Sequence, residues 1–341
     1  MIAPLNFPAR LRTIASARHF ATALALSGLI AATPSTMALA EEPPIQLVLI
    51  SFDGAHDNAL WERSLKLADR TGAKFTYFLS CTFLITKADR KRYRAPGQAA
   101  GRSNVGFAQD NADVLTRLGH IWAAHQAGHE IGSHGCGHFD GKDWSKSDWL
   151  SEFGQFDSAL ANAWRNNGAE APPGWAGFAG SGVTGFRAPY LSAGDGLFAA
   201  LAAHGLSYDA STVSRGPEMP DLSRPTASFA LPLIPEGPQG RRIIAMDYNL
   251  FVRHSAAFET PSKAQEFEER TLEAFRAAFE AEYAGERRPL QLGFHFVEMN
   301  GGAYWNALER FATETCGRPE VECVTYQDAL RRLESSDGSA S

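Results

Sequence analysis

Residues 128–138, GHEIGSHGCGH, carry two histidines four residues apart, His134 and His138. Two imidazoles at this spacing can point the same way from one turn of helix, which suits a divalent metal ion. The apolar lead-in around Ile131 is typical of the end of a strand, and Gly135 and Gly137 allow a sharp turn after it. We expect both histidines at a strand's carboxyl end as metal ligands, although a bare H-x-x-x-H also arises by chance in a loop.

The elements before this segment predict a β-α-β unit. Residues 46–53, QLVLISFD, form an apolar run that ends in Asp53, as expected for a parallel strand buried on both faces. Residues 60–70 then have helical spacing, Gly72 ends that helix, and the aromatic run 74–79 follows as a second strand.

The alternation of strands and helices continues along the chain. Helices are predicted over 111–126, 144–166, 195–204, 263–283, 303–313 and 326–333, and strands over 206–209, 242–247, 290–297 and 322–325. The segments 86–110, 172–182 and 210–238 are predicted to be irregular, and the first of them is a long excursion that could line a substrate groove.

This alternation predicts an α/β fold, a single distorted (β/α) barrel of about seven strands, with a doubly wound open sheet as the alternative. In either fold, functional groups belong at the carboxyl ends of the strands. The groups that fall there are Asp53, His134, His138, Arg187 and His295.

The first 40 residues have the order of a secretory signal peptide. Three arginines without an acid precede an Ala/Leu-rich run, and Ala38-Leu39-Ala40 ends the segment. We expect cleavage after Ala40, a periplasmic or extracellular location, a single (β/α) barrel domain over 41–335 and a disordered tail over 336–341. The apolar run of the leader is too short to span a bilayer, and no later segment reaches about 18 apolar residues, so no stable membrane span is expected.

The charge and the cysteine content limit the classes of partner and the cellular compartment that we expect. The chain of 341 residues has 44% apolar residues and a formal charge of −6, and loss of the three leader arginines would leave 29 basic against 38 acidic residues. This acidic balance disfavours a nucleic-acid partner. In an exported protein the four cysteines are expected to form two disulfides, Cys81 with Cys136 and Cys316 with Cys323; the alternatives are buried free thiols, or Cys136 as a metal ligand.

Five separated motifs give the sequence, from about Gln46 to Leu333, a resemblance to the polysaccharide deacetylases of the NodB-homology group, the family 4 carbohydrate esterases. The family's T-F-D-D-G corresponds to Ser51-Phe52-Asp53-Gly54-Ala55, its H-[ST]-x-x-H to residues 134–138, and its R-x-P-[FY] to Arg187-Ala188-Pro189-Tyr190. Its late L-x-H corresponds to the strand that carries His295, with Gly293 in place of leucine. Tyr208-Asp209 lies where a fourth motif would begin, without that motif's tryptophan.

The resemblance implies removal of N-acetyl, less often O-acetyl, groups from a glycan by a metal-bound water. Asp53 would be the general base and His295 the general acid. His134 and His138 would hold the divalent ion, for which the resemblance implies zinc, and Arg187 would orient Asp53 and keep it ionised. The backbone N–H of Tyr190 would help to stabilise the oxyanion.

One departure concerns the metal. The family's second motif-one aspartate is Gly54 here, which offers no side chain. Asp57 or His56 could supply the third ligand, two histidines and water could suffice, or the metal site could be lost; we favour Asp57, because a catalytic zinc usually has three protein ligands.

Two other function classes remain open from the sequence: a metal-independent amidohydrolase that acts on a small amide, and a non-catalytic glycan-binding protein. The histidine pair argues against the first, whereas Asp53, Arg187 and His295 argue against the second. We expect a monomer whose partner is an acetylated glycan.

Overall fold

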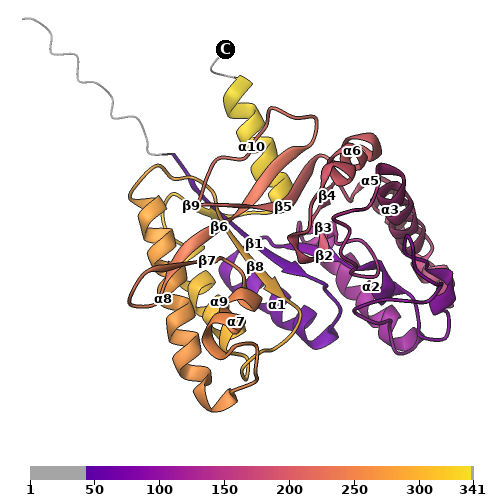
Figure 1. Cartoon of the computed structure of the whole chain (residues 1–341), viewed down its shortest axis with the longest axis horizontal. Coiled ribbons are helices and arrows are strands. Elements are labelled where there is room, and N and C mark those ends of the chain that lie inside the picture. Colours follow the sequence, from indigo (N-terminus) through magenta and orange to yellow (C-terminus); the bar gives the residue numbers. More distant parts are fainter. Residues whose placement is uncertain (1–43, 339–341) are drawn as a thin grey trace, which may run out of the picture. The chain divides into compact units, whose positions relative to one another are not determined.

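The computed structural model of the protein describes residues 44–338, with side chains to residue 335 (Figure 1). The predicted signal peptide and the last three residues therefore lie outside the described part of the chain. Within residues 44–338, no helix is long and apolar enough to cross a membrane.

One sheet organises the described residues, and its path runs β7-β6-β5-β4-β3-β2-β1-β8, with β9 paired to β1. All pairings along it are parallel except β6 with β7. The strands are β1 (Gln46–Asp53), β2 (Thr76–Leu79), β3 (Glu130–Ser133), β4 (Gly185–Phe186), β5 (Tyr208–Ser214), β6 (Ala227–Glu236), β7 (Arg241–Ile244), β8 (Leu290–His295) and β9 (Val321–Cys323).

Helices connect these strands and cover the sheet (Figure 1). They are α1 (Asn58–Thr71), α2 (Asn111–Gln126), α3 (Lys146–Ala161), α4 (Ala163–Asn166), α5 (Trp175–Ser181), α6 (Asp195–His204), α7 (Asp247–Ser255), α8 (Ala264–Tyr283), α9 (Ala303–Thr315) and α10 (Tyr326–Gly338). Short 3-10 turns lie at Cys81–Leu84, Arg90–Arg92, Pro189–Leu191 and Pro261–Lys263.

The sheet curls until its two ends meet, which confirms the barrel prediction and excludes a doubly wound open sheet. The residues that follow β7, at one end of the path, bond to β8, at the other end. Gly293 N–H on β8 donates to Ala245 O at 2.9 Å, while Ala245 N–H donates to Pro232 O on β6 at 2.9 Å. Met246 and Gly293 form an isolated parallel bridge at this seam. A Cβ at Gly293 would lie 2.8 Å from the Met246 methyl carbon, so the Met246 side chain would have to move if residue 293 carried a side chain.

Central strand β1 is buried at every residue, as its unbroken apolar sequence predicts. Phe52 stacks on Tyr77 and Trp305, with ring centroids 5.3 Å and 5.1 Å apart. Helix α1 begins after Asp57, whose carboxylate accepts the Leu60 N–H at 2.9 Å, and ends at Gly72 in the left-handed conformation. The burial of β1 and the cap at the start of α1 together fix the position of the turn between them. Asp53 lies at the β1 end of that turn.

Four parts of the secondary-structure prediction are wrong. Residues 172–182 contain helix α5, because Trp175 and Phe178 are buried against its neighbours although the segment is rich in glycine and proline. Residues 210–238 contain the end of β5 and all of β6, whose prolines argue against a strand. Helix α7 begins at Asp247 within the predicted strand 242–247, without a side-chain cap to signal its start. Helix α10 continues to Gly338, three residues into the predicted tail.

Both predicted disulfides, Cys81–Cys136 and Cys316–Cys323, are present. The alternatives of free thiols and of Cys136 as a metal ligand are thereby excluded, because the sulfur atoms of all four cysteines are bonded in disulfides. Cys81 follows β2 and Cys136 follows β3, so the first bond joins two loops at the carboxyl edge of the sheet.

Candidate active site

A cavity of about 590 Å³ opens at the carboxyl ends of the strands. The residues predicted to do chemistry line it together with residues from several loops: Asp53, Asn104, Val105, His134, His138, Ala188, Tyr190, Leu191, Ile244, Met246, Tyr248, Asn249, His295 and Val297. The strand register explains the gathering, because Asp53 is paired directly with His295, and Ser133 with Phe186. Arg187 and His134 each follow one of these paired ends.

Arg187 forms a fully buried ion pair with Asp53, and its Nη1 donates to Asp53 Oδ1 at 2.8 Å. The same guanidinium donates to the Ser51 hydroxyl, the Tyr326 hydroxyl and the Ala210 carbonyl, so its position is fixed from four sides. Burial alone would raise the pKa of Asp53, but Arg187, with His134 and His295, outweighs it and holds that pKa below its usual value. Asp53 is therefore a carboxylate at neutral pH.

His295 is paired with a residue that the sequence analysis did not assign a role, Asp247. The ring Nδ1–H of His295 donates to Asp247 Oδ1 at 2.6 Å, and the His295 backbone N–H donates to Asp247 Oδ2 at 2.8 Å. Burial alone would lower the pKa of His295, but Asp247 and then Asp53 outweigh it and raise that pKa above 6.5. The pair leaves Nε2 as the ring nitrogen that can give up a proton in the cavity.

His134 and His138 come together as predicted, with ring centroids 5.1 Å apart, but not from a helical turn. Residues 134–138 form a loop in which Gly135 (φ 66°) and His138 (φ 53°) have left-handed backbone conformations. His134 Nδ1–H donates to the Arg187 carbonyl at 2.8 Å, which leaves Nε2 with a free lone pair. Burial lowers the pKa of His134, and it lowers that of His138 to about 3, so both rings are neutral donors.

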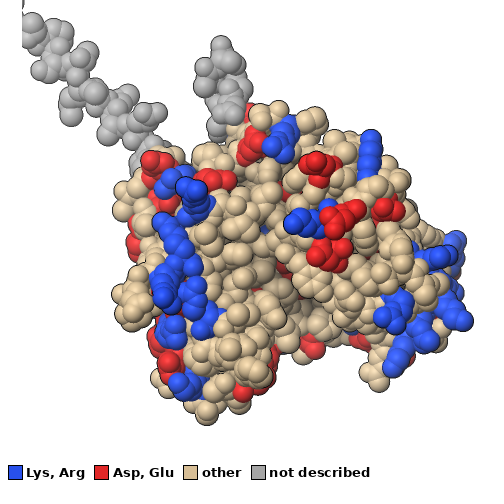
Figure 2. Space-filling view, in the orientation of Figure 1, with Lys and Arg blue, Asp and Glu red and all other residues tan. Residues whose placement is uncertain are grey.

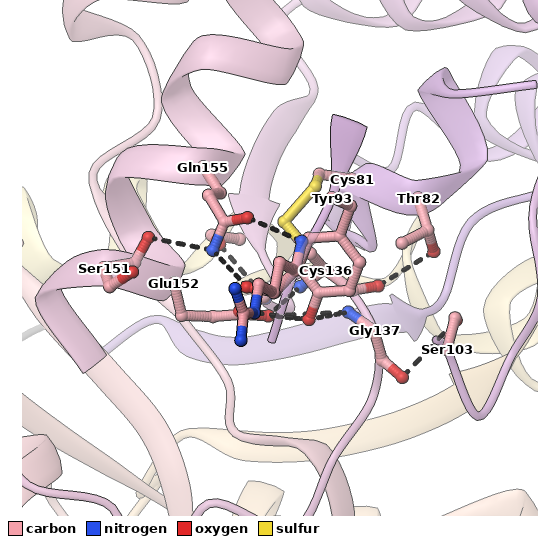
Figure 3. The surroundings of a disulfide bond; sticks show 12 residues. Cys81, Thr82, Tyr93, Ser103, Cys136, Gly137, Ser151, Glu152 and Gln155 are labelled. Atoms are coloured by element: carbon pink, nitrogen blue, oxygen red, sulfur yellow. Dashed lines mark hydrogen bonds between the residues drawn. A yellow bond between two sulfur atoms is a disulfide. The ribbon is translucent and has the colours of Figure 1, made fainter. Parts of the chain in front are cut away.

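Hydrogen bonds and a disulfide hold the loop between the two histidines in place (Figure 3). Buried Glu152 on α3 accepts the Cys136 N–H at 2.8 Å and the Tyr93 hydroxyl at 3.0 Å, and Tyr93 in turn accepts the Gly137 N–H at 3.0 Å. The disulfide to Cys81 lies beside these bonds. These contacts replace the helix in holding the imidazoles on one side of the loop.

Tyr190 stands at the rim of the cavity and is 60% exposed. Its backbone is left-handed (φ 59°, ψ 11°), an uncommon conformation for a residue with a side chain, and its ring packs edge-on against His138 with centroids 4.6 Å apart. The 86–110 excursion also reaches the cavity, through Asn104 and Val105. It is tied to the histidine loop, since Asn104 Nδ2 donates to the His138 carbonyl at 2.9 Å.

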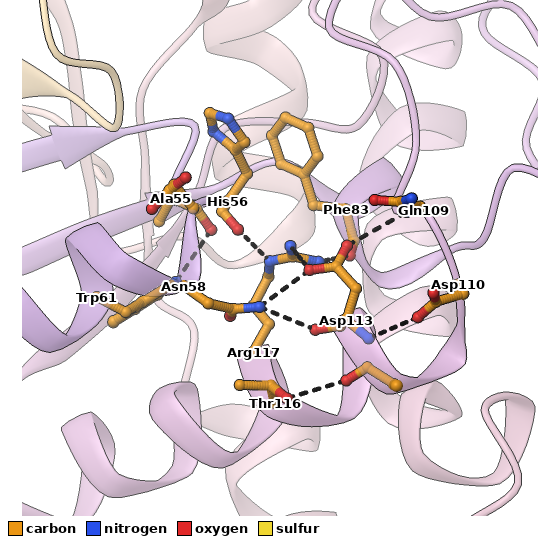
Figure 4. A network of polar contacts seen from close by, with 12 residues as sticks. Ala55, His56, Asn58, Trp61, Phe83, Gln109, Asp110, Asp113, Thr116 and Arg117 are labelled. Atoms are coloured by element: carbon orange, nitrogen blue, oxygen red, sulfur yellow. Dashed lines mark hydrogen bonds and ion pairs between the residues drawn. The ribbon is translucent and has the colours of Figure 1, made fainter.

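Asp57 does not join the histidine pair, contrary to our expectation. Its carboxylate caps α1 and does not line the cavity. The adjoining backbone is held by buried Arg117, which donates to the carbonyls of His56 and Phe83 at 2.6 Å each (Figure 4). The hydrogen bond to the first turn of α1 thus fixes the direction of the Asp57 carboxylate.

The side chain of His56, the other candidate third ligand, contacts the backbone that precedes it. Its Nδ1 lies 3.0 Å from the Gly54 carbonyl, and its ring stacks on Phe83 with centroids 4.8 Å apart (Figure 4). Within residues 44–338, no group of three or more His, Cys, Asp or Glu side chains is arranged to hold a metal ion. The donors that fit a metal ion are therefore the two neutral imidazoles, with Asp53 lining the same cavity.

Comparisons with known proteins give structural matches only. No protein-family model matches the sequence, and no curated protein matches it. The chain is similar to a solved structure assigned as a polysaccharide deacetylase from Mycobacterium smegmatis (17% identity over 88% of this chain and 94% of that one, TM-score 0.56). It is also similar to one from Pseudomonas aeruginosa PAO1 (15% identity, 84% and 90% coverage, TM-score 0.50) and to Puue allantoinase (15% identity, 85% and 91% coverage, TM-score 0.51).

At these identities the matches establish the fold alone. They cover nearly all of the described residues and nearly all of each matched chain, so the whole barrel is shared rather than one β-α-β unit. The barrel whose strand ends carry Asp53, His134, Arg187 and His295 has the fold of the polysaccharide deacetylases.

Proposed function

We propose that the protein is a metal-dependent deacetylase that removes N-acetyl groups from an exported or cell-surface polysaccharide. The observation that carries this proposal is one cavity that holds a carboxylate kept ionised by Arg187, a histidine whose pKa is raised by Asp247 against the effect of burial, and two neutral imidazoles. This set contains a base, an acid and a metal-binding pair, which amide hydrolysis by an activated water requires.

His134 and His138 would hold a divalent ion, zinc in our proposal, with water completing its coordination. When bound, the ion supplies Lewis acidity, which polarises the acetyl carbonyl and lowers the pKa of a water molecule. The neutral state of both rings supports this assignment, as does the Arg187 carbonyl that fixes the His134 tautomer.

The two acid–base residues divide the proton transfers. Asp53 Oδ1 is engaged by Arg187, so Oδ2 is the oxygen that takes the proton of the attacking water. As the amide C–N bond breaks, the His295 imidazolium gives its Nε2 proton to the departing amine, and acetate carries away the oxygen of the water. Asp247 stabilises the imidazolium before that transfer.

Acetate release from acetylated chitooligosaccharides tests the proposal directly. The purified protein should release acetate, a chelator should abolish the release, and added Zn²⁺ or Co²⁺ should restore it. The Asp53→Asn variant, measured in parallel, controls for contaminating hydrolases. No release from chitooligosaccharides, acetylated peptidoglycan fragments or acetylated exopolysaccharide, with metal supplied, would refute it.

A second candidate is a metal-independent amidohydrolase that acts on a small amide. The observation in its favour is the absence of a third metal-ligating side chain within the described residues, and one structural match is an allantoinase. Chelator-resistant hydrolysis of allantoin or a related small amide, without acetate release from glycans, would favour this candidate.

A further inference from the structure

The segment 87–102 carries an unusual concentration of positive charge for this protein. It contains six basic residues and one acidic residue, whereas the whole chain has a formal charge of −6. All six are exposed: Lys87, Arg90, Lys91, Arg92, Arg94 and Arg102. Figure 2 shows Lys and Arg gathered on the right of the view, where Figure 1 draws this segment next to α2 and α3. We call these six residues, together with exposed Arg165 after α3, the basic patch.

Most of these cations have no carboxylate partner. Among the described residues, only Arg92 is within ion-pair distance of an acid, Asp89, at 3.3 Å, and both of those side chains are substantially exposed. Several exposed arginines elsewhere are neutralised, as Arg276 is by Glu314 and Arg310 by Glu268 and Glu269. Like charges held close together repel one another, so an anion from outside the chain would stabilise the patch.

A cavity of about 280 Å³ lies within the basic patch, between the 85–93 segment and helices α3 and α4. Arg92 and Arg165 line it together with three side-chain amides, those of Gln155, Asn162 and Asn166, and none of its lining residues is acidic. Guanidinium groups are donors that suit carboxylate, sulfate or phosphate oxygens, whereas the amide of Gln155 already donates to the Arg94 and Ser151 carbonyls. Arg165 is pre-positioned, since its Nη2 donates to Asn162 Oδ1 at 2.5 Å.

The segment is held firmly against α3, so the patch has a fixed shape. Arg94 and Gln155 exchange two hydrogen bonds of 2.9 Å: the Arg94 backbone N–H donates to Gln155 Oε1, and Gln155 Nε2 donates to the Arg94 carbonyl (Figure 3). The Arg90 side chain lies over Gly101, where a Cβ would approach it to 2.9 Å.

The basic patch is continuous with the catalytic cavity along the chain. Arg102 is two residues before Asn104, which lines that cavity and donates its backbone N–H to the Gly137 carbonyl at 2.8 Å. Tyr93 and Cys81 line the patch cavity, and both are bonded to the histidine loop from its other side. The segment 87–105 therefore carries the basic patch at one end and a residue that lines the catalytic cavity at the other.

We infer that the substrate is an acidic polysaccharide, whose carboxylate, sulfate or phosphate groups bind the basic patch at Arg92 and Arg165 while an acetylated sugar occupies the catalytic cavity. This inference rests on the proposed function for the reaction. The anion site itself rests only on the charges and the cavity of the basic patch. An anionic membrane surface is the alternative partner, and the shared segment 87–105 favours the glycan because it joins the patch to the catalytic cavity.

Binding can be measured separately from catalysis. Fluorescently labelled oligogalacturonate and a neutral chitooligosaccharide of equal length are titrated with the full chain at low and high NaCl. The charged oligomer should bind at least about tenfold more tightly at low salt, and the difference should disappear at high salt because ions screen exposed charges. Sulfated and phosphorylated oligosaccharides, tested in the same way, identify which anionic group binds best.

The Arg92→Gln/Arg165→Gln protein should lose about tenfold in affinity for the charged oligomer, as expected for two charge-assisted contacts, and keep its affinity for the neutral one. The matched control, Lys66→Gln/Arg241→Gln, removes the same charge from exposed positions on other elements and should change affinity less than about twofold. Thermal unfolding of each variant confirms that the fold is intact.

Two results would overturn the inference: equal affinity for charged and neutral oligomers, or preferential binding to phosphatidylglycerol vesicles that Arg92→Gln/Arg165→Gln abolishes. Equal losses in the two double variants would show a general charge effect and would also refute a site at Arg92 and Arg165. Acetate release is assayed separately on wild-type protein, so retained patch binding without any release would refute the deacetylase proposal and leave the anion site standing.

Discussion

Asp247 holds His295 by two hydrogen bonds, one from the ring Nδ1–H to Oδ1 and one from the backbone N–H to Oδ2. The two residues belong to different elements, since Asp247 begins α7 and His295 ends β8. Asp247 is fully buried, so its charge acts on the ring through a poorly screened environment.

Replacing Asp247 with Asn should shift the pH dependence of deacetylation. Asp247 is a large part of why the pKa of His295 lies above 6.5, and its removal leaves burial, which lowers that pKa. A general acid acts when protonated, so activity falls as pH rises through its pKa, and the falling limb of the kcat/KM profile should move to lower pH. An unchanged limb would show that His295 is not the acid.

The same pair makes stability depend on pH. A histidine whose pKa is raised by folding contributes stability that is fully present below its unfolded pKa of about 6.5 and is lost as pH rises through the folded value. Wild-type Tm should therefore fall between about pH 6 and the mildly alkaline range by more than the Tm of Asp247→Asn does. Parallel Tm curves for the two proteins would contradict this linkage.

Asp53→Asn should lower kcat by about 10²- to 10⁴-fold, because an amide cannot take the proton of the water. The amide oxygen can still accept from Arg187 Nη1, so the buried guanidinium keeps a hydrogen bond although it loses its counter-charge. Bound metal, measured by elemental analysis, should remain near the wild-type level. Near-normal turnover would require a different base.

Asp57→Ala should lower stability by about 1 kcal/mol through loss of the α1 cap and should leave metal affinity unchanged. Metal titration of the variant and of wild type measures this, with chemical denaturation as the stability readout. A marked fall in affinity would restore Asp57 as the third ligand, the expectation drawn from the sequence.

Metal binding should depend on the histidines and not on the disulfide between them. His138→Ala should abolish binding of a divalent ion. Cys81→Ser/Cys136→Ser should cost about 2–5 kcal/mol of stability but keep the ion, because Glu152 and Tyr93 still hold the loop. Loss of metal from the folded cysteine variant would show that the disulfide is needed to position the rings.

The sequence predicted the parts of the site that lie at strand ends, because strand burial is visible as apolar runs and parallel strands end at one edge. Asp53, His134, Arg187 and His295 were placed in this way. Asp247 was missed although it lay at the end of a predicted strand, and a systematic search for carboxylates at strand ends would have found it.

The direction of a side chain was harder to predict than its position. Asp57 is near the site in sequence, but the first turn of α1 uses its carboxylate. The two histidine rings lie together as predicted but not on a helical turn, since the contacts with Tyr93, Glu152 and Cys81 that hold their loop come from segments distant in sequence. Strand β6 was missed for a similar reason: its pairing with β5 and β7 outweighs its prolines.

The contact between Met246 and Gly293 has a practical consequence for anyone who engineers this protein. Residue 293 lies two positions before His295, and residue 246 lies one before Asp247, so a change that pushes the two backbones apart would also separate His295 from Asp247. Introducing leucine at 293, to match the resembled motif, calls for a smaller residue at 246 in the same step. Library designs should therefore vary positions 246 and 293 as a coupled pair.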